Sequence, residues 1–106
     1  MVRTVVLTVA GVLSWTPGQA IVIDRIFIES AGADMAVSTD PQFDPATLIA
    51  QDQQFDELIA AGISFGSLMR SERICGTPVP EGQTIYFSAD QLAAFYVYYS
   101  LPSVSN

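Results

Sequence analysis

Catalytic chemistry in this sequence would have to come from carboxylates. Three pairs lie close together along the chain, namely Asp40 with Asp44, Asp52 with Asp56, and Asp56 with Glu57. Two carboxylates can hydrolyse a glycosidic bond, one as the acid and the other as base or nucleophile. The same oxygens, together with Asp34, could bind Ca²⁺, although no calcium-binding loop motif surrounds them. We interpret these residues instead as helix caps and solvated loop positions.

The residue types most used in catalysis and metal binding are missing. The sequence has no His, and its four basic residues are all Arg: Arg3, Arg25, Arg70 and Arg73. Without His there is no Ser–His or Cys–His pair, and without Lys there is no Schiff base or phosphate-loop lysine. We therefore expect a protein that is not an enzyme and that uses no cofactor and no metal. The single Cys75 excludes an internal disulfide, and we expect it to be a small buried hydrophobe.

Charge is unusually sparse. Half of the 106 residues are apolar and 14% are charged, whereas an ordinary soluble domain has about 25% charged residues. Either the protein is a weakly charged soluble monomer, or neighbouring subunits cover much of its surface, because interface cores are depleted in charge. We favour assembly. The net charge of −7 argues against nucleic acid and anionic membranes as partners, and leaves a basic patch on a protein partner possible.

An aromatic segment at residues 94–99 is the most distinctive feature. It has high β propensity, no charge and no Pro, so it would aggregate as an exposed edge strand. We expect it to be a central strand or part of an interface, with Phe95, Val97 and Tyr99 facing the core. Tyr96 and Tyr98 then lie on the outer face, where they contact a neighbour, lie flat on a solvated sheet, or stack on a sugar. The candidate interface residues are four aromatic side chains: Trp15, Tyr86, Tyr96 and Tyr98.

Strands dominate the elements that must position these residues. Period-2 patterns and turn residues predict strands at residues 4–10, 20–30, 35–39, 63–69, 72–75, 83–89 and 95–100. The strand at 35–39 follows a short turn and looks like the second half of a hairpin with 20–30. In residues 20–30, strict alternation would place Ile21 and Ile23 on one face of the strand and Ile26 and Ile28 on the other. Either both faces of that strand are buried, or a bulge at Asp24-Arg25 places all four isoleucines on one face.

Helical signals are confined to two places. Asp44-Pro45 resembles a helix cap with Pro at the first position, Asp52 is a second possible cap, and Gly62 could end a helix. We expect one or two short helices in the 44–61 connection, or else an irregular loop anchored over the core. A single helical turn is also expected within residues 88–94. The apolar run at 5–13 loosely mimics a signal peptide but is too short to span a membrane, and it reads as a strand.

Two segments, 17–23 and 80–87, each begin with a Pro/Gly turn that leads into a β run. Two strands entered in the same way are compatible with a jelly roll. We therefore expect residues 1–106 to form a single all-β domain, an antiparallel jelly-roll-like sandwich.

With these turn-plus-strand units, the aromatic last strand and a Ser/Thr/Gln-rich surface, the chain resembles small β-sandwich proteins of tailed-phage virions, such as capsid decoration (cement) proteins. The resemblance implies a non-enzymatic virion structural protein on the capsid surface. Its partners would be copies of itself, as a homotrimer or other homo-oligomer, and the major capsid protein or another virion protein. The alternative is a carbohydrate- or receptor-binding module of a phage tail or fibre.

Overall fold

The computed structural model describes residues 2–30, 32–53 and 69–102. Within these residues the elements are β1 (Val2–Trp15), β2 (Ile21–Ser30), β3 (Asp34–Ser38), the 3₁₀ turn η1 (Pro45–Thr47), β4 (Leu48–Gln53), β5 (Met69–Val79) and β6 (Ile85–Ser100). All strand pairs are antiparallel. The predicted all-β antiparallel fold is confirmed. No helix in the described part of the chain is long and apolar enough to cross a membrane.

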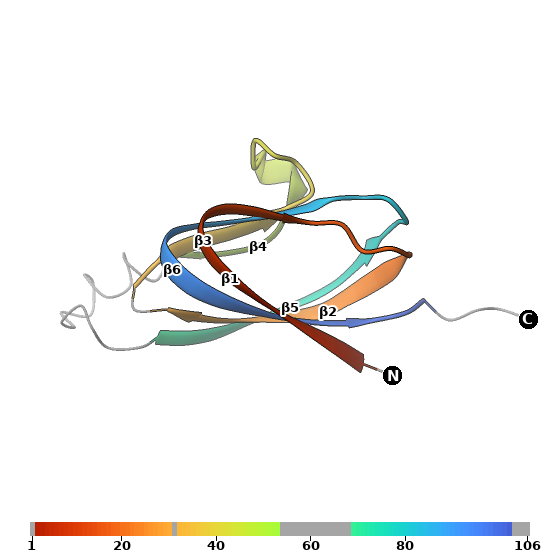
Figure 1. The fold of residues 1–106 in the computed structure, drawn as a ribbon, viewed down its shortest axis with the longest axis horizontal. Coiled ribbons are helices and arrows are strands. Elements are labelled where there is room, and N and C mark those ends of the chain that lie inside the picture. Colours follow the sequence, from red (N-terminus) through yellow and green to blue (C-terminus); the bar gives the residue numbers. More distant parts are fainter. Residues whose placement is uncertain (1, 31, 54–68, 103–106) are drawn as a thin grey trace, which may run out of the picture.

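The sheet is folded into two layers that share β1 and β6. The strand order is β4-β3-β6-β2-β5, and β1 pairs with the other edge of β6. The first half of β6 pairs with β3 and its second half with β2, whereas β1 follows β6 through both halves. Consequently β3 and β4 lie in one layer and β2 and β5 in the other, which gives a sandwich joined at one side (Figure 1). The aromatic segment of β6 is a central strand, as expected.

The strand β6 bends at a corner rather than forming the predicted helical turn. The pairing with β1 jumps from Val9–Ala93 to Gly11–Ala89. Three residues of β6, Asp90 to Leu92, therefore lie opposite one residue of β1, and all three are exposed. A carboxylate oxygen of Asp90 accepts a hydrogen bond from the backbone N–H of Asp34 at 2.8 Å, which ties the corner to the start of β3.

A bulge in β2 accounts for the isoleucine pattern. The register shifts between Ile23 and Arg25 against both neighbouring strands. Asp24 is an extra residue of β2 relative to β6. Because of it, the isoleucines before the bulge and those after it point to the same face of the sheet. All four isoleucines (Ile21, Ile23, Ile26 and Ile28) are at most 1% exposed. Of the two alternatives for this strand, the bulge is therefore confirmed.

The predicted hairpin between β2 and β3 is wrong, because β3 pairs with β4 and β6. The hydroxyl of Ser30 accepts hydrogen bonds from the backbone N–H groups of Gly32 and Ala33, at 3.2 and 2.8 Å. This turn carries the chain from one layer to the other, so consecutive strands lie in different layers.

The 44–61 connection is only partly helical. Asp44 caps the 3₁₀ turn, its carboxylate accepting from the N–H of Ala46 at 2.9 Å, and Pro45 is the first residue of the turn. The chain then forms β4, which pairs with β3, so residues 48–53 are a strand and not a helix. The predicted second helix and the predicted strand at 63–69 fall almost wholly outside the described residues.

The core lies between the layers and is drawn from every strand. Its largest fully buried side chains are Phe87, Phe95, Ile21, Ile23, Ile26, Ile28 and Ile85. Phe87 comes from the first half of β6 and Phe95 from the second, and their rings meet edge to face with centroids 5.4 Å apart. One strand thus supplies both sides of a central aromatic contact.

Candidate functional site

The outer face of the layer that contains β2 and β5 carries the most distinctive surface. Cross-strand pairing places Val6, Tyr96, Phe27 and Glu72 in one row across β1, β6, β2 and β5. The next row is Thr4, Tyr98, Arg25 and Ile74. We call these eight residues the outer aromatic face. They are brought together because the alternating side chains of all four strands point inward to the core.

Contacts among the aromatic residues hold the centre of this face in place. The rings of Phe27 and Tyr96 meet edge to face at a centroid distance of 5.7 Å. The guanidinium of Arg25 lies over the ring of Tyr98, 4.3 Å from its centroid. The same guanidinium bonds to a carboxylate oxygen of Glu72 at 3.3 Å. Because these contacts already restrict the side chains, less rotamer freedom is lost when a partner binds.

Apolar residues flank this centre on both sides. Ile74 on β5 is 78% exposed and Val6 on β1 is 53% exposed. Burying a side chain such as Ile74 fully in an interface would contribute about 1.5–3 kcal/mol. The charges on the face are Arg25 and Glu72, which neutralise each other through their ion pair.

The four candidate interface residues do not form one site. Tyr96 and Tyr98 lie together on the outer aromatic face, both half-buried. Tyr86 pairs with Ser38 and Ser14 in the other layer, so it lies on a different face. Trp15 packs toward the core, with its ring 5.5 Å from that of Tyr99 in an edge-to-face contact. A common aromatic platform that includes Trp15 is therefore not present.

Sequence reasoning missed several members of the face, chiefly Arg25, Phe27 and Ile74. The signal for two of them was present, because a bulge at Asp24-Arg25 that turns the isoleucines inward also turns Arg25 and Phe27 outward. The same reasoning does not predict Ile74, because its orientation depends on how β5 is paired with β2.

The carboxylates of Asp40 and Asp44 satisfy backbone N–H groups. Asp40 accepts hydrogen bonds from the backbone N–H of Gln42 at 3.1 Å and from that of Asp44 at 3.4 Å. Asp44 caps η1. Asp44 is therefore a cap and Asp40 a loop position that accepts from the backbone. Asp56 and Glu57 lie outside the described residues.

Asp52 departs from its predicted role as a cap. It is a buried residue of β4, and its carboxylate accepts a hydrogen bond from the guanidinium of Arg73 on β5 at 3.1 Å. This ion pair joins the two layers at their open side. Across the described residues, no group of three or more His, Cys, Asp or Glu side chains could hold a metal ion.

Cys75 is half-buried and packs against the core. Burial raises the pKa of its thiol above the ordinary value, and a backbone hydrogen bond from Ile26 offsets part of this effect. A raised pKa keeps the thiol protonated and therefore poorly nucleophilic. This environment suits the small hydrophobe that we expected.

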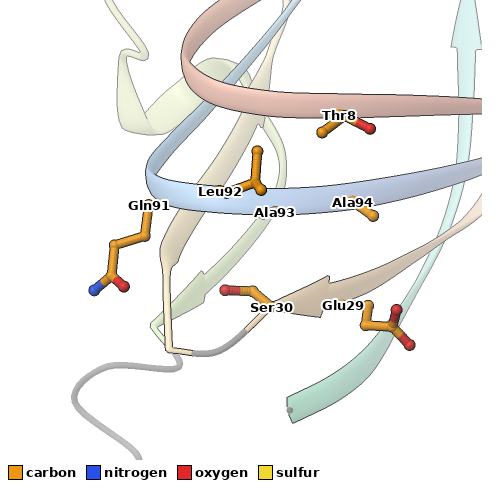
Figure 2. A pocket seen from close by; sticks show the side chains of 7 residues that line it. All are labelled: Thr8, Glu29, Ser30, Gln91, Leu92, Ala93 and Ala94. Atoms are coloured by element: carbon orange, nitrogen blue, oxygen red, sulfur yellow. The ribbon is translucent and has the colours of Figure 1, made fainter. Parts of the chain in front are cut away.

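An open hollow of about 360 Å³ lies at the corner of β6. It is lined by Thr8, Glu29, Ser30, Gln91, Leu92, Ala93 and Ala94 (Figure 2). The hydroxyl of Ser30 already accepts two backbone hydrogen bonds. What remains of the lining is largely apolar. Ala94 lies between Thr8 and Glu29 in the same cross-strand row.

The chain was also compared with known proteins. No protein-family model, curated protein or solved structure matches it significantly.

Proposed function

We propose that this protein is a non-enzymatic structural subunit that binds protein neighbours through the outer aromatic face. The observation that carries the proposal is the composition of that face: an aromatic centre held by internal contacts, flanked by exposed Ile74 and Val6. Interfaces between proteins are enriched in aromatic residues and Arg and depleted in unpaired charge. The low charge of the whole sequence supports the same class of function.

The arrangement of the rings favours a protein partner over a sugar. Stacking on a sugar needs an open aromatic ring face. Arg25 lies over one face of the Tyr98 ring, and Phe27 packs edge to face with Tyr96. Binding a carbohydrate on Tyr98 from that side would first displace the guanidinium and break its ion pair with Glu72.

The setting that we propose is the capsid surface of a tailed phage. There the subunit would decorate the shell by contacts with copies of itself, as a trimer or other homo-oligomer, and with the major capsid protein. This part of the proposal rests on the resemblance of the sequence to capsid decoration proteins.

Sedimentation velocity of the purified protein and two variants tests the role of the face. We expect the wild type to form a species larger than a monomer. Ile74→Lys should shift it to a smaller species, because a lysine cannot be buried at the interface without a partner. Leu92→Lys is the matched control, since Leu92 is 66% exposed at the corner, away from the face. Equal behaviour of the two variants would exclude the face as the site of association.

A glycan array separates the proposal from the carbohydrate-binding alternative. A structural subunit should give no saccharide signal. Specific binding of a glycan that is lost in Tyr98→Ala would replace our proposal with the alternative.

A further inference from the structure

We propose that residues 3–9 of β1 pair antiparallel with the same segment of a second copy of this chain, with Val6 opposite Val6 of that copy. One edge of β1 is paired with β6 from Val2 to Val9 and again from Gly11 to Trp15. Within the described part of the chain, no strand pairs with its other edge. This leaves a row of backbone N–H and C=O groups that can accept a further strand.

Nothing in the sequence of this strand protects the edge. Open edges in monomeric proteins are usually blocked by lysines, prolines or several charges. Arg3 is the one charged residue in β1, and the strand has no Pro and no Lys. Val2 and Val6, on the outward side of the strand, are 59% and 53% exposed. The edge is therefore suited to pairing.

The edges of β4 and β5 are bridged by side-chain contacts instead. The guanidinium of Arg73 donates to the backbone carbonyl of Gln51 at 3.2 Å and to the carboxylate of Asp52. The thiol of Cys75 lies 4.0 Å from the carbonyl oxygen of Ile49. Pro78 further limits strand addition to β5. Among the described strands, β1 thus offers the accessible edge.

Charge and symmetry identify the second strand as a copy of the same segment. The chain has a net charge of −7, so two copies repel each other over most of their surfaces. Residues 3–9 contain no acidic side chain, and this segment lets two copies approach without placing carboxylates together. An antiparallel pair related by a two-fold axis is self-complementary, because each contact occurs twice.

The corner in the sheet limits this pairing. Beyond Val9 the strand bends at the register jump, and Gly11 adopts a positive φ of 100°. A straight partner can therefore follow the segment only as far as Val9. A two-fold pair also uses the same edge of both copies, so it closes as a dimer and does not continue as a filament.

The pair would enlarge the surface proposed above. A two-fold axis between antiparallel strands is perpendicular to the sheet, so corresponding faces of both copies lie on the same side. The two outer aromatic faces would form one continuous surface. This consequence rests on the proposed function, whereas the pairing itself rests on the edge of β1.

Hydrogen exchange and sedimentation test the pairing. We expect alternate backbone amides of residues 3–9, those directed away from β6, to exchange more slowly as the protein concentration rises. Val6→Lys should abolish this protection and convert dimer to monomer, because a lysine from each copy would lie beside the symmetry axis. Val12→Lys is the matched control: Val12 is 67% exposed on the same strand, beyond the bend, so its replacement should leave the dimer intact.

The outcomes separate this inference from the proposed function. A wild type without concentration-dependent protection of these amides, or loss of the dimer in both valine variants, overturns the edge pairing. If Ile74→Lys disrupts the association and the amides of residues 3–9 show no concentration-dependent protection, the outer aromatic face holds and the edge pairing fails. If these amides are protected in the associated wild type and Ile74→Lys leaves the association unchanged, the edge pairing holds and the function proposed for the face fails.

Discussion

Two ion pairs of the same chemistry occupy different environments. The carboxylate of Asp52 is completely inaccessible to solvent and bonds to Arg73, whereas the side chains of Arg25 and Glu72 are 47% and 42% exposed. A carboxylate taken out of water needs compensation from its partners, while an exposed pair gains little over its hydrated groups. The Asp52–Arg73 pair is therefore a structural link between the layers, and the other pair belongs to the surface.

Replacement of each arginine by methionine compares the two environments directly. Arg73→Met should lower the free energy of unfolding by about 1.5–3 kcal/mol, because the buried carboxylate loses a charged donor. Arg25→Met should lower it by only about 0–1 kcal/mol. Urea denaturation of the three proteins measures both values. Similar losses in the two variants would show that the Asp52–Arg73 pair has no special role.

At the scale of the elements, two irregularities in neighbouring strands occur side by side. The bulge of β2 at Asp24 lies opposite Cys75 and Gly76 of β5, where the register jumps from Thr77 to Ile74. Gly76 has a positive φ of 61° there. A glycine adopts this conformation without steric cost, whereas other residues do so only with strain. The bulge that orients the isoleucines thus depends on a glycine in the adjacent strand.

Alanine substitutions at two glycines test this dependence. Gly76→Ala should lower the free energy of unfolding by about 1–2 kcal/mol, since an L-residue is strained at this φ. An added Cβ meets no atom within 4 Å at either Gly76 or Gly18, and Gly18 has no positive φ. Gly18→Ala therefore isolates the effect of backbone conformation, and thermal unfolding of both variants measures it. An unchanged stability of Gly76→Ala would contradict the argument.

The sequence predicts those elements whose pattern is decided locally. The alternation in β1 and the aromatic run of β6 indicate the correct strands and inward faces. The isoleucines of β2 indicate the correct strand, with the observed bulge as one of two alternatives. The sequence does not predict β4. Asp44-Pro45 indicates the start of a helix, and the residues after the 3₁₀ turn are extended because they pair with β3. The partner of Asp52 is likewise non-local. The outer aromatic face could be predicted through its tyrosines, but the contribution of β5 required the register.

At the scale of the whole molecule, the two layers are held together by contacts between the two halves of β6. Phe87 and Phe95 are both fully buried and touch across the core. Since edge-to-face pairs contribute beyond the area that they bury, this contact should couple the stability of the layers.

A double-mutant cycle with Phe87→Leu and Phe95→Leu measures that coupling. We expect the double variant to be less destabilised than the sum of the single variants, by about 0.5–1.5 kcal/mol. Leucine keeps both sites apolar, so the fold should survive both changes. Urea unfolding gives the four free energies. Strict additivity would show that the two layers are stabilised independently of the ring contact.

The pairing of β1 with β6 also determines when this chain can fold during its synthesis. Val2 lies opposite Ser100, so the first of the described strands to be synthesised has the last of them as its partner. β2 and β3 pair with β6 as well. A nascent chain that stops before residue 85 can pair β2 with β5 and β3 with β4, but the exposed valines of β1 have no ladder to join. Closing so long a loop is slow, and the waiting chain is prone to aggregate. We expect its yield in cells to depend on chaperones that bind β1 until β6 has been made.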